Sequence, residues 1–292
     1  MNNFLTVATL GVFYFWGKVR VRRYLLSETE FLDDRFAYHG TGKEVLIGWL
    51  KAGVVFGLPL VALQILPDLV GNRAVAMGAR ILASGVVALM IPVAMVGARR
   101  YRLSRTSWRG IRFSFRGRAG EFVRLFVAGW VLTALTLGIS YPIFDAKRQA
   151  FLVAHTYFGN QRFEFDGRGR DLLGSFLVTL LLTVPTLGLC WFWFLAKRRR
   201  YFWDQTTFAT SRFHSTVGAF PLLALVMGNA LLLFGTLGLA WPLVKVRNIR
   251  FALRYLSLEG PLDLERIQQE AQAATATGEG LTSFLDADFD IG

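Results

Sequence analysis

The chain has 292 residues, of which 53% are hydrophobic and only 18% charged, whereas about a quarter of the residues of an ordinary soluble protein are charged. The formal net charge is +13 and the mean hydropathy is +0.41. These values exclude a disordered chain and disfavour a soluble enzyme or a soluble nucleic-acid-binding domain, because long apolar runs between arginine-rich loops are typical of a polytopic membrane protein.

Five apolar runs are long enough to form a transmembrane helix, which needs about 20 residues. The first two predict a helical hairpin that covers 45–98 and turns at a short polar segment. The other three runs are 122–146, 172–196 and 219–244. Ionisable residues occur only near the ends of these runs. The most polar side chain deep within them is Asn229, which is therefore our candidate for a polar position in the membrane core.

Internal repetition is the most informative feature of the sequence. Thr-Leu-Gly begins at residues 9, 136, 186 and 236, and the last three copies are separated by steps of 50. A second threonine, a cation, an aromatic residue, an Arg-Phe pair and an acid recur at fixed offsets from these motifs. The pattern predicts units at about 1–44, 78–121, 122–171, 172–218 and 219–256, with the hairpin 45–98 inserted.

Each unit combines an apolar segment, a basic aromatic segment and a β-hairpin. Phe158-Gly159-Asn160-Gln161 is a turn signal between strands of alternating polarity. The cations and rings of the basic segment suit the headgroup level of a bilayer. Nine positions are candidate lipid-headgroup or interface residues: Arg20, Tyr24, Arg35, Arg112, Lys147, Arg162, Lys197, Arg212 and Arg247.

The motifs resemble those of the YjgN-like family, bacterial inner-membrane proteins with a domain of unknown function. The resemblance rests on Thr9-Leu10-Gly11 with the segment 14–20, on 35–40, on 106–113 and on the later Thr-Leu-Gly copies, and it extends over about 4–256. It implies a multi-pass protein of the bacterial inner membrane and brings no substrate or catalytic residue. Family members place a further hairpin before the first Thr-Leu-Gly, so the first unit is expected to be truncated or its start misassigned.

From these observations we predict an all-α membrane protein, a multi-pass helical bundle of tandem repeats of about 50 residues with short interhelical β-hairpins. Two topologies remain open. In one, each apolar run of 24–26 residues crosses the membrane once, so that successive basic loops face opposite sides. In the other, Thr-Leu-Gly is the tip of a re-entrant hairpin, all the basic loops share one side, and their hairpins can pair into a common sheet.

The sequence assigns no catalytic, cofactor or metal site. The three histidines occupy non-equivalent positions and lack ligand spacing, and no nucleophile elbow or phosphate-binding loop is present. We therefore expect no enzymatic activity and no cofactor. The expected activity is transport or a channel, since glycine-broken helices occur in transporters. The alternative is a non-transporting scaffold or a protein that binds anionic lipids.

The segment 257–292 differs from the rest of the chain, because it contains eight acidic side chains and one arginine. We expect an acidic, largely flexible tail. It is a candidate docking segment for the basic loops or for a cytoplasmic partner. The expected partners are thus anionic membrane lipids and such a cytoplasmic partner for the tail, without nucleic acid, and the oligomeric state is left open.

Overall fold

The computed structural model describes residues 9, 12–69, 72–261 and 267. The chain forms two compact units, one built mainly from residues up to Val127 and the other from Ala128 onward. The acidic tail predicted at 257–292 lies almost entirely outside the described residues. Each unit is described separately below.

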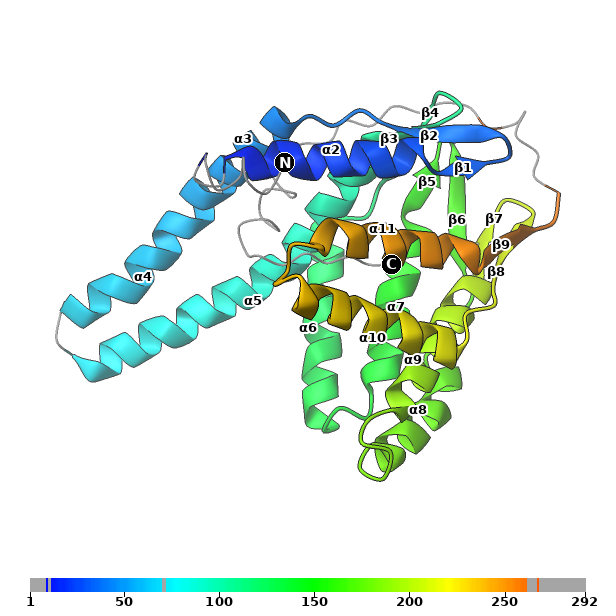
Figure 1. Ribbon diagram of the computed structural model, residues 1–292. Coiled ribbons are helices and arrows are strands. Elements are labelled where there is room, and N and C mark those ends of the chain that lie inside the picture. The colour runs from blue at the N-terminus through cyan, green and yellow to red at the C-terminus, as the bar shows by residue number, and fades with distance from the viewer. Residues whose placement is uncertain (1–8, 10–11, 70–71, 262–266, 268–292) are drawn as a thin grey trace. The chain divides into compact units, whose positions relative to one another are not determined.

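The first unit contains the longest helices of the described chain (Figure 1). Helix α2 (Phe13–Ser27) leads into strands β1 (Glu30–Phe31) and β2 (Asp34–Tyr38). A nearly continuous helical arm follows, made of α3 (Gly42–Ala52), a π-helical turn (Gly53–Gly57) and α4 (Leu58–Leu69). It packs against α5 (Arg73–Ser104) in the hairpin that the sequence predicts.

The arms of this hairpin are long and apolar enough to cross a membrane, over Gly42–Leu63 and Arg73–Ser104. They meet along an apolar seam in which Ala52, Met90 and Ala94 are buried beside Phe56 and Leu60. Length and composition alone do not distinguish such helices from other apolar helices. After α5, the strands β3 (Thr106–Trp108) and β4 (Ile111–Phe115) complete a sheet ordered β1-β2-β3-β4.

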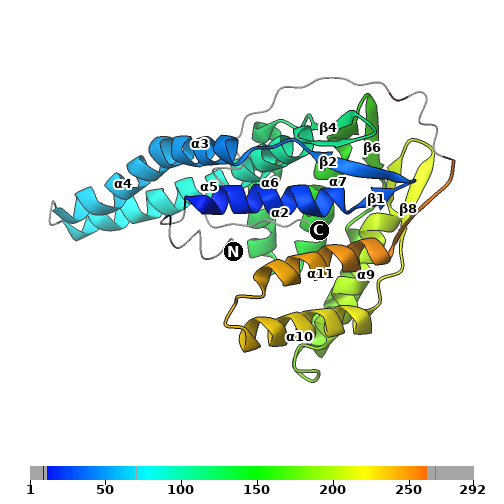
Figure 2. The ribbon, with the colours of Figure 1, turned by 45° about the horizontal axis from the view of Figure 1, so that its top comes forward.

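Three helical hairpins follow in chain order. They are α6 (Ala119–Leu135) with α7 (Tyr141–Ala154), α8 (Arg170–Leu182) with α9 (Cys190–Asp204), and α10 (Ala219–Gly235) with α11 (Trp241–Arg254). The turn of each hairpin contains Thr-Leu-Gly, and each hairpin returns the chain to a strand. In Figures 1 and 2 the hairpin α10–α11 points in a different direction from α8–α9.

The strands of the second unit are β5 (Thr156–Phe158), β6 (Gln161–Phe165), β7 (Thr206–Phe208), β8 (Ser211–Ser215) and β9 (Leu256–Glu259). They pair antiparallel in chain order. Alternation along β6 and β8 places Phe163 and Phe213 on one face, with ring centroids 6.3 Å apart, and places the arginine of each Arg-Phe pair on the other face.

The prediction of an all-α multi-pass bundle is wrong. The described chain contains nine antiparallel strands, and only two of its helices are candidate membrane spans. The hairpin at 157–165 is confirmed, with Tyr157 opposite Arg162. Strands about 45 residues apart also pair with one another, with Phe163 opposite Phe208, so that the hairpins form sheets instead of short isolated links. Each run from 122 to 244 folds as two helices joined at Thr-Leu-Gly, which agrees with the hairpin alternative for these runs and differs from the single-crossing alternative.

Candidate functional site

The Thr-Leu-Gly motif closes each helical hairpin with the same hydrogen bonds. Leu187 has a left-handed φ of 49° and Gly188 a φ of 82°. The Gly188 amide donates to the Thr183 carbonyl at 2.8 Å, and the Leu187 amide donates to the Val184 carbonyl at 3.2 Å. This is a Schellman motif, in which a leucine occupies the left-handed position that glycine usually takes.

The threonine of the motif connects the two helices. In α8–α9 the Thr186 hydroxyl donates to the Leu182 carbonyl at 2.6 Å and accepts the Cys190 amide at 3.3 Å. The turns at 136 and 236 repeat both contacts. The turn therefore makes most of its own backbone hydrogen bonds and does not depend on water for them.

The leucine at each tip is almost fully exposed. The exposed fractions are 91% for Leu137, 93% for Leu187 and 94% for Leu237. Neighbouring apolar side chains are also open, among them Leu135, Val184 and Phe234. Three such apolar tips would be unfavourable in water, and they mark surfaces that contact a membrane or another protein.

Among the candidate interface residues, those on helices differ from those on strands. Lys147 and Arg247 are exposed on α7 and α11, whereas Lys197 on α9 is half-buried, with its ammonium near the Ser175 hydroxyl and 5.3 Å from the Trp193 ring centroid. Arg20 and Tyr24 are exposed on α2.

The arginines of the Arg-Phe pairs, Arg35, Arg112, Arg162 and Arg212, are exposed on strands. Acids neighbour two of them: Arg35 lies 3.9 Å from Glu30, and Arg212 lies 3.9 Å from Asp166. The strand face thus carries both signs of charge. It is a weaker candidate for an anionic ligand than the helix cations.

Asn229 is 7% exposed, and its amide donates to the Asn248 side-chain oxygen at 2.7 Å. Its own side-chain oxygen is buried without a hydrogen-bond partner among the described residues. The nearby threonines donate to carbonyls of their own helices, Thr133 to Gly129 and Thr179 to Ser175. This pairing gives Asn229 a structural role at the α10–α11 contact.

Sequence reasoning missed a buried ionic cluster between α7 and α9. The Asp145 side chain is 1% exposed and pairs with Arg148 at 2.7 Å and with Arg198, whose Nη2 lies 3.0 Å from it. Because two guanidinium groups surround one carboxylate, the contact ties consecutive hairpins together. No local sequence signal links residues 53 positions apart.

The three arginines that follow Lys197 have different environments. Arg198 pairs with Asp145, as described above. Burial lowers the pKa of Arg199, and the adjacent Arg198 charge lowers it further. Arg200 is exposed and has no hydrogen-bond or ion-pair partner within the described part of the chain.

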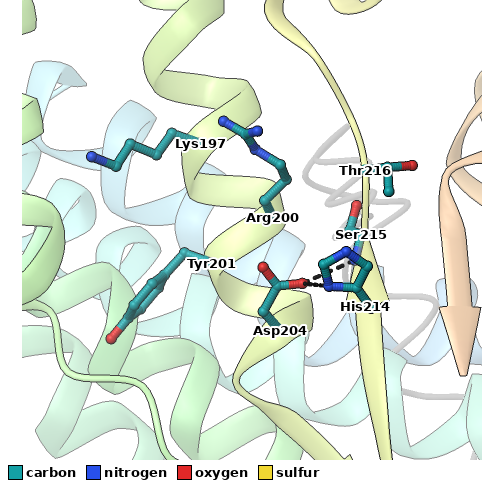
Figure 3. A pocket seen from close by; sticks show the side chains of 7 residues that line it. All are labelled: Lys197, Arg200, Tyr201, Asp204, His214, Ser215 and Thr216. Atoms are coloured by element: carbon teal, nitrogen blue, oxygen red, sulfur yellow. Dashed lines mark hydrogen bonds and ion pairs between the residues drawn. The ribbon is translucent and has the colours of Figure 1, made fainter. Parts of the chain in front are cut away.

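Arg200 lines a hollow of about 450 Å³ between α9 and the end of β8 (Figure 3). The Asp204 carboxylate contacts His214 Nδ1 at 3.0 Å and accepts the Ser215 amide at 2.9 Å. The complete lining is Lys197, Arg200, Tyr201, Asp204, His214, Ser215 and Thr216. Sequence reasoning singled out only Lys197 of this set, since the grouping depends on the strand returning beside the helix.

Tyr201 anchors the base of the hairpin α8–α9. Its hydroxyl donates to Asp171 and accepts the Arg168 amide at 2.6 Å. Burial raises the pKa of Tyr201 to about 12, and the hydrogen bond to Asp171 contributes to the rise. In the first unit, the Tyr101 hydroxyl donates to Glu44 at 2.8 Å in the corresponding way.

The described residues contain no group of three or more histidine, cysteine or acidic side chains able to hold a metal ion. His39 bonds Ser107, His155 bonds the Phe151 carbonyl, and His214 pairs with Asp204.

A family model described as a bacterial protein of unknown function (DUF898) matches residues 1–196 and 175–284. The inner membrane protein YjgN of Escherichia coli O157:H7 is 30% identical over 115 residues, 39% of this chain and 27% of that protein. The Salmonella typhimurium LT2 protein of the same name is 26% identical over 157 residues, 50% of this chain and 38% of that protein. The matched part of the chain therefore spans well under half of these relatives. No solved structure matches.

Proposed function

Since this chain belongs to the DUF898 family of bacterial proteins of unknown function, and its relatives named above are inner membrane proteins, we propose that it is an inner-membrane protein that binds anionic lipid headgroups at the bases of apolar helical hairpins. We propose binding without transport or catalysis. The observation that carries the proposal is the exposed leucine at each Thr-Leu-Gly tip.

Dimensions support insertion into one leaflet. The distance from Leu187 back to Lys197 along the chain corresponds to about 15 Å of helix at 1.5 Å per residue. The hydrocarbon core is about 30 Å thick, so a tip at mid-bilayer places Lys197 near the headgroups. The self-contained hydrogen bonds of the turn meet the requirement that backbone groups in hydrocarbon have partners.

The hairpin of Gly42–Leu63 and Arg73–Ser104 is proposed to cross the whole membrane twice. Its arms are long enough, and its turn contains the exposed polar residues Asn72 and Arg73. In this arrangement all hairpin bases, with the sheets, lie on one side. The eight arginines of 99–120 favour the cytoplasm for that side.

The lipid-binding role is favoured over transport for two reasons. Lys147, Lys197 and Arg247 lie at the same place in successive hairpins, where each cation near an anionic leaflet contributes about 1 kcal/mol. Asn229, the polar candidate within the apolar runs, is paired with Asn248 across the α10–α11 contact, which supports a structural role for it.

Cysteine labelling in intact cells tests the topology. In a Cys190→Ser background, single cysteines replace Asn72, Ala37, Asn160 and Thr210, all of them exposed, and an impermeant maleimide is added. We expect labelling at 72 alone, and labelling of the other three after lysis. Labelling of 160 in intact cells together with protection of 37 would refute the one-sided arrangement.

Lipid binding is tested with neutralised variants in native mass spectrometry. The triple variant Lys147→Gln, Lys197→Gln, Arg247→Gln is expected to retain less phosphatidylglycerol than the unmodified protein. The control Arg35→Gln, Arg162→Gln, Arg212→Gln removes the same charge from the strands and is expected to retain it. Equal losses in both would contradict a specific role for the helix cations.

A further inference from the structure

We propose that the hollow between α9 and β8 is a binding site for a phosphate group, carried by a lipid headgroup or free in solution. This inference rests on the proposed function, because it gives one hairpin base a specific ligand. It depends on the polar groups that remain without partners in the hollow.

Arg200 provides the principal charge. Its side chain is exposed at the hollow and has no partner within the described residues, whereas its neighbour Arg198 is committed to Asp145. A guanidinium group can donate two parallel hydrogen bonds to phosphate oxygens, which an ammonium cannot do. Figure 3 shows Arg200 on α9, with Ser215 and Thr216 on the facing segment.

One hydroxyl group, that of Ser215, completes the donors, because the Thr216 side chain points away from Arg200 in Figure 3. Ser215 is 2% exposed and lines the hollow, and its hydroxyl has no hydrogen-bond partner among the residues that the structure describes. The Thr216 hydroxyl is likewise without one, although the Thr216 amide donates to the Tyr255 carbonyl at 3.0 Å. The Ser215 hydroxyl can therefore donate a hydrogen bond to a ligand oxygen in the hollow.

The one acid of the lining does not oppose an anion strongly. Asp204 is occupied by the His214 ring and the Ser215 amide. With Lys197 and Arg200 in the same lining, the formal charge of the hollow is positive even with a neutral histidine. The volume of about 450 Å³ lies in the range of small-ligand sites and exceeds what a phosphate group needs, which leaves room for part of a headgroup.

The test measures binding to the purified full chain in detergent by the change of intrinsic tryptophan fluorescence and of melting temperature. Three probes are titrated: dihexanoyl phosphatidic acid, dihexanoyl phosphatidylcholine and inorganic phosphate. We expect saturable binding of the phosphatidic acid. Comparable binding of inorganic phosphate identifies free phosphate as a sufficient ligand, whereas lipid binding without phosphate binding identifies the headgroup. Absence of both overturns the proposal.

Arg200→Gln is expected to weaken binding about tenfold or more, because hydrogen bonds to charged groups are among the stronger ones. The matched control is Arg250→Gln, since Arg250 is exposed at the corresponding position of α11 and its loss removes the same charge. Ser215→Ala changes no charge and is expected to weaken binding severalfold. If Arg200→Gln and Arg250→Gln weaken binding equally, or if Ser215→Ala has no effect, the anionic probe is attracted only nonspecifically to the basic surface. Either outcome would overturn the proposed site.

Failure of this site is distinguishable from failure of the proposed function. Arg200→Gln and Ser215→Ala are expected to leave the cysteine-labelling pattern unchanged. A chain that inserts as proposed but binds none of the probes refutes the site alone. A chain in which position 160 is labelled in intact cells while position 37 is protected refutes the proposed function.

Discussion

The long hairpin of α4–α5 and the short hairpin α8–α9 differ most at their tips. The long hairpin turns at Asn72, whose side chain caps α5 by accepting the Ala74 and Val75 amides at 3.0 and 3.4 Å. The short hairpin turns at Thr186-Leu187-Gly188, where the outermost side chain is leucine. A polar tip suits water and an apolar tip suits hydrocarbon. In the proposed arrangement, tip polarity therefore separates a hairpin that crosses the membrane from one that stops inside it.

The seams of the two hairpins also differ. Small and apolar side chains join the long arms, whereas hydroxyl and thiol groups join the short ones: Cys190 Sγ lies 3.3 Å from the Thr179 carbonyl, and the Trp191 indole donates to the Thr183 hydroxyl at 3.1 Å. Hydrogen bonds between the two helices of the short hairpin fix their position along one another more specifically than apolar packing alone would do.

The largest expected effect comes from a charge at the tip. Leu187→Asp places a carboxylate in hydrocarbon and is expected to disfavour insertion by about 2.5–3.5 kcal/mol. Asn72→Asp is the control, because aspartate is also a good N-cap. The measurement is the fraction of protein that resists carbonate extraction. If both variants behave alike, the contrast between the tips is wrong.

The threonine of the short tip gives the next largest effect. Thr186→Val leaves the Cys190 amide without its acceptor, at an expected cost of about 1–3 kcal/mol in the free energy of unfolding. Asn72→Ala removes a cap in water and is expected to cost about 1 kcal/mol. Unfolding by SDS titration in mixed micelles compares them. A smaller loss for Thr186→Val than for Asn72→Ala would contradict a water-free tip.

Glycine substitutions are expected to act in opposite directions. Gly188→Ala forces a side chain into a φ of 82° and is expected to destabilise by about 1–2 kcal/mol. Gly85 in α5 has open space around it, so Gly85→Ala is expected to stabilise by about 1 kcal/mol through helix propensity. The same titration measures both, and destabilisation by Gly85→Ala would indicate close packing there.

The smallest expected effect concerns a tyrosine that both hairpins have at their base, Tyr101 in the long hairpin and Tyr201 in the short one. Burial raises the pKa of Tyr201 in the folded chain to about 12, above the value of about 10 for an unfolded tyrosine. The contribution of Tyr201 to the free energy of unfolding is therefore complete below pH 10 and is lost as the pH rises toward 12. Tyr201→Phe is expected to cost about 1 kcal/mol at neutral pH and to remove this dependence. Tyr24→Phe, at an exposed position, serves as the control; an unchanged alkaline profile in Tyr201→Phe would contradict the assignment.

Local signals in the sequence predicted the local structure. The turn at Gly159-Asn160 gave the correct β-hairpin, and two long apolar runs gave the hairpin α4–α5. The register that places Phe163 opposite Phe208 was beyond such signals, since strands of three to five residues carry little pattern of their own. The two-helix fold of 122–146 was one of two open alternatives, because Thr-Leu-Gly interrupts neither the apolar composition nor the length expected of one crossing.

Only part of the candidate site could be predicted from the sequence. Repetition drew attention to Lys197, and it treated the strand arginines as equal to the helix cations. The acidic neighbours of Arg35 and Arg212 now distinguish the strand set from the helix cations. Asp204 and His214 were missed because they do not recur: the positions 50 residues after Asp204 and before His214 hold Arg254 and Glu164. Arg200 recurs as Arg250, but sequence reasoning did not single out this position.

The order of the strands has a consequence for biosynthesis. Because β5 to β9 pair in the order in which they are made, each segment of about 50 residues can dock on the one before it as it leaves the ribosome, which adds about 5–20 residues per second. A chain released early would end in an open strand edge, the feature by which unfinished sheets associate with one another. Strand β9, which pairs with β8 from Arg212 opposite Glu259 to Ser215 opposite Leu256, covers the edge that synthesis up to β8 would leave exposed.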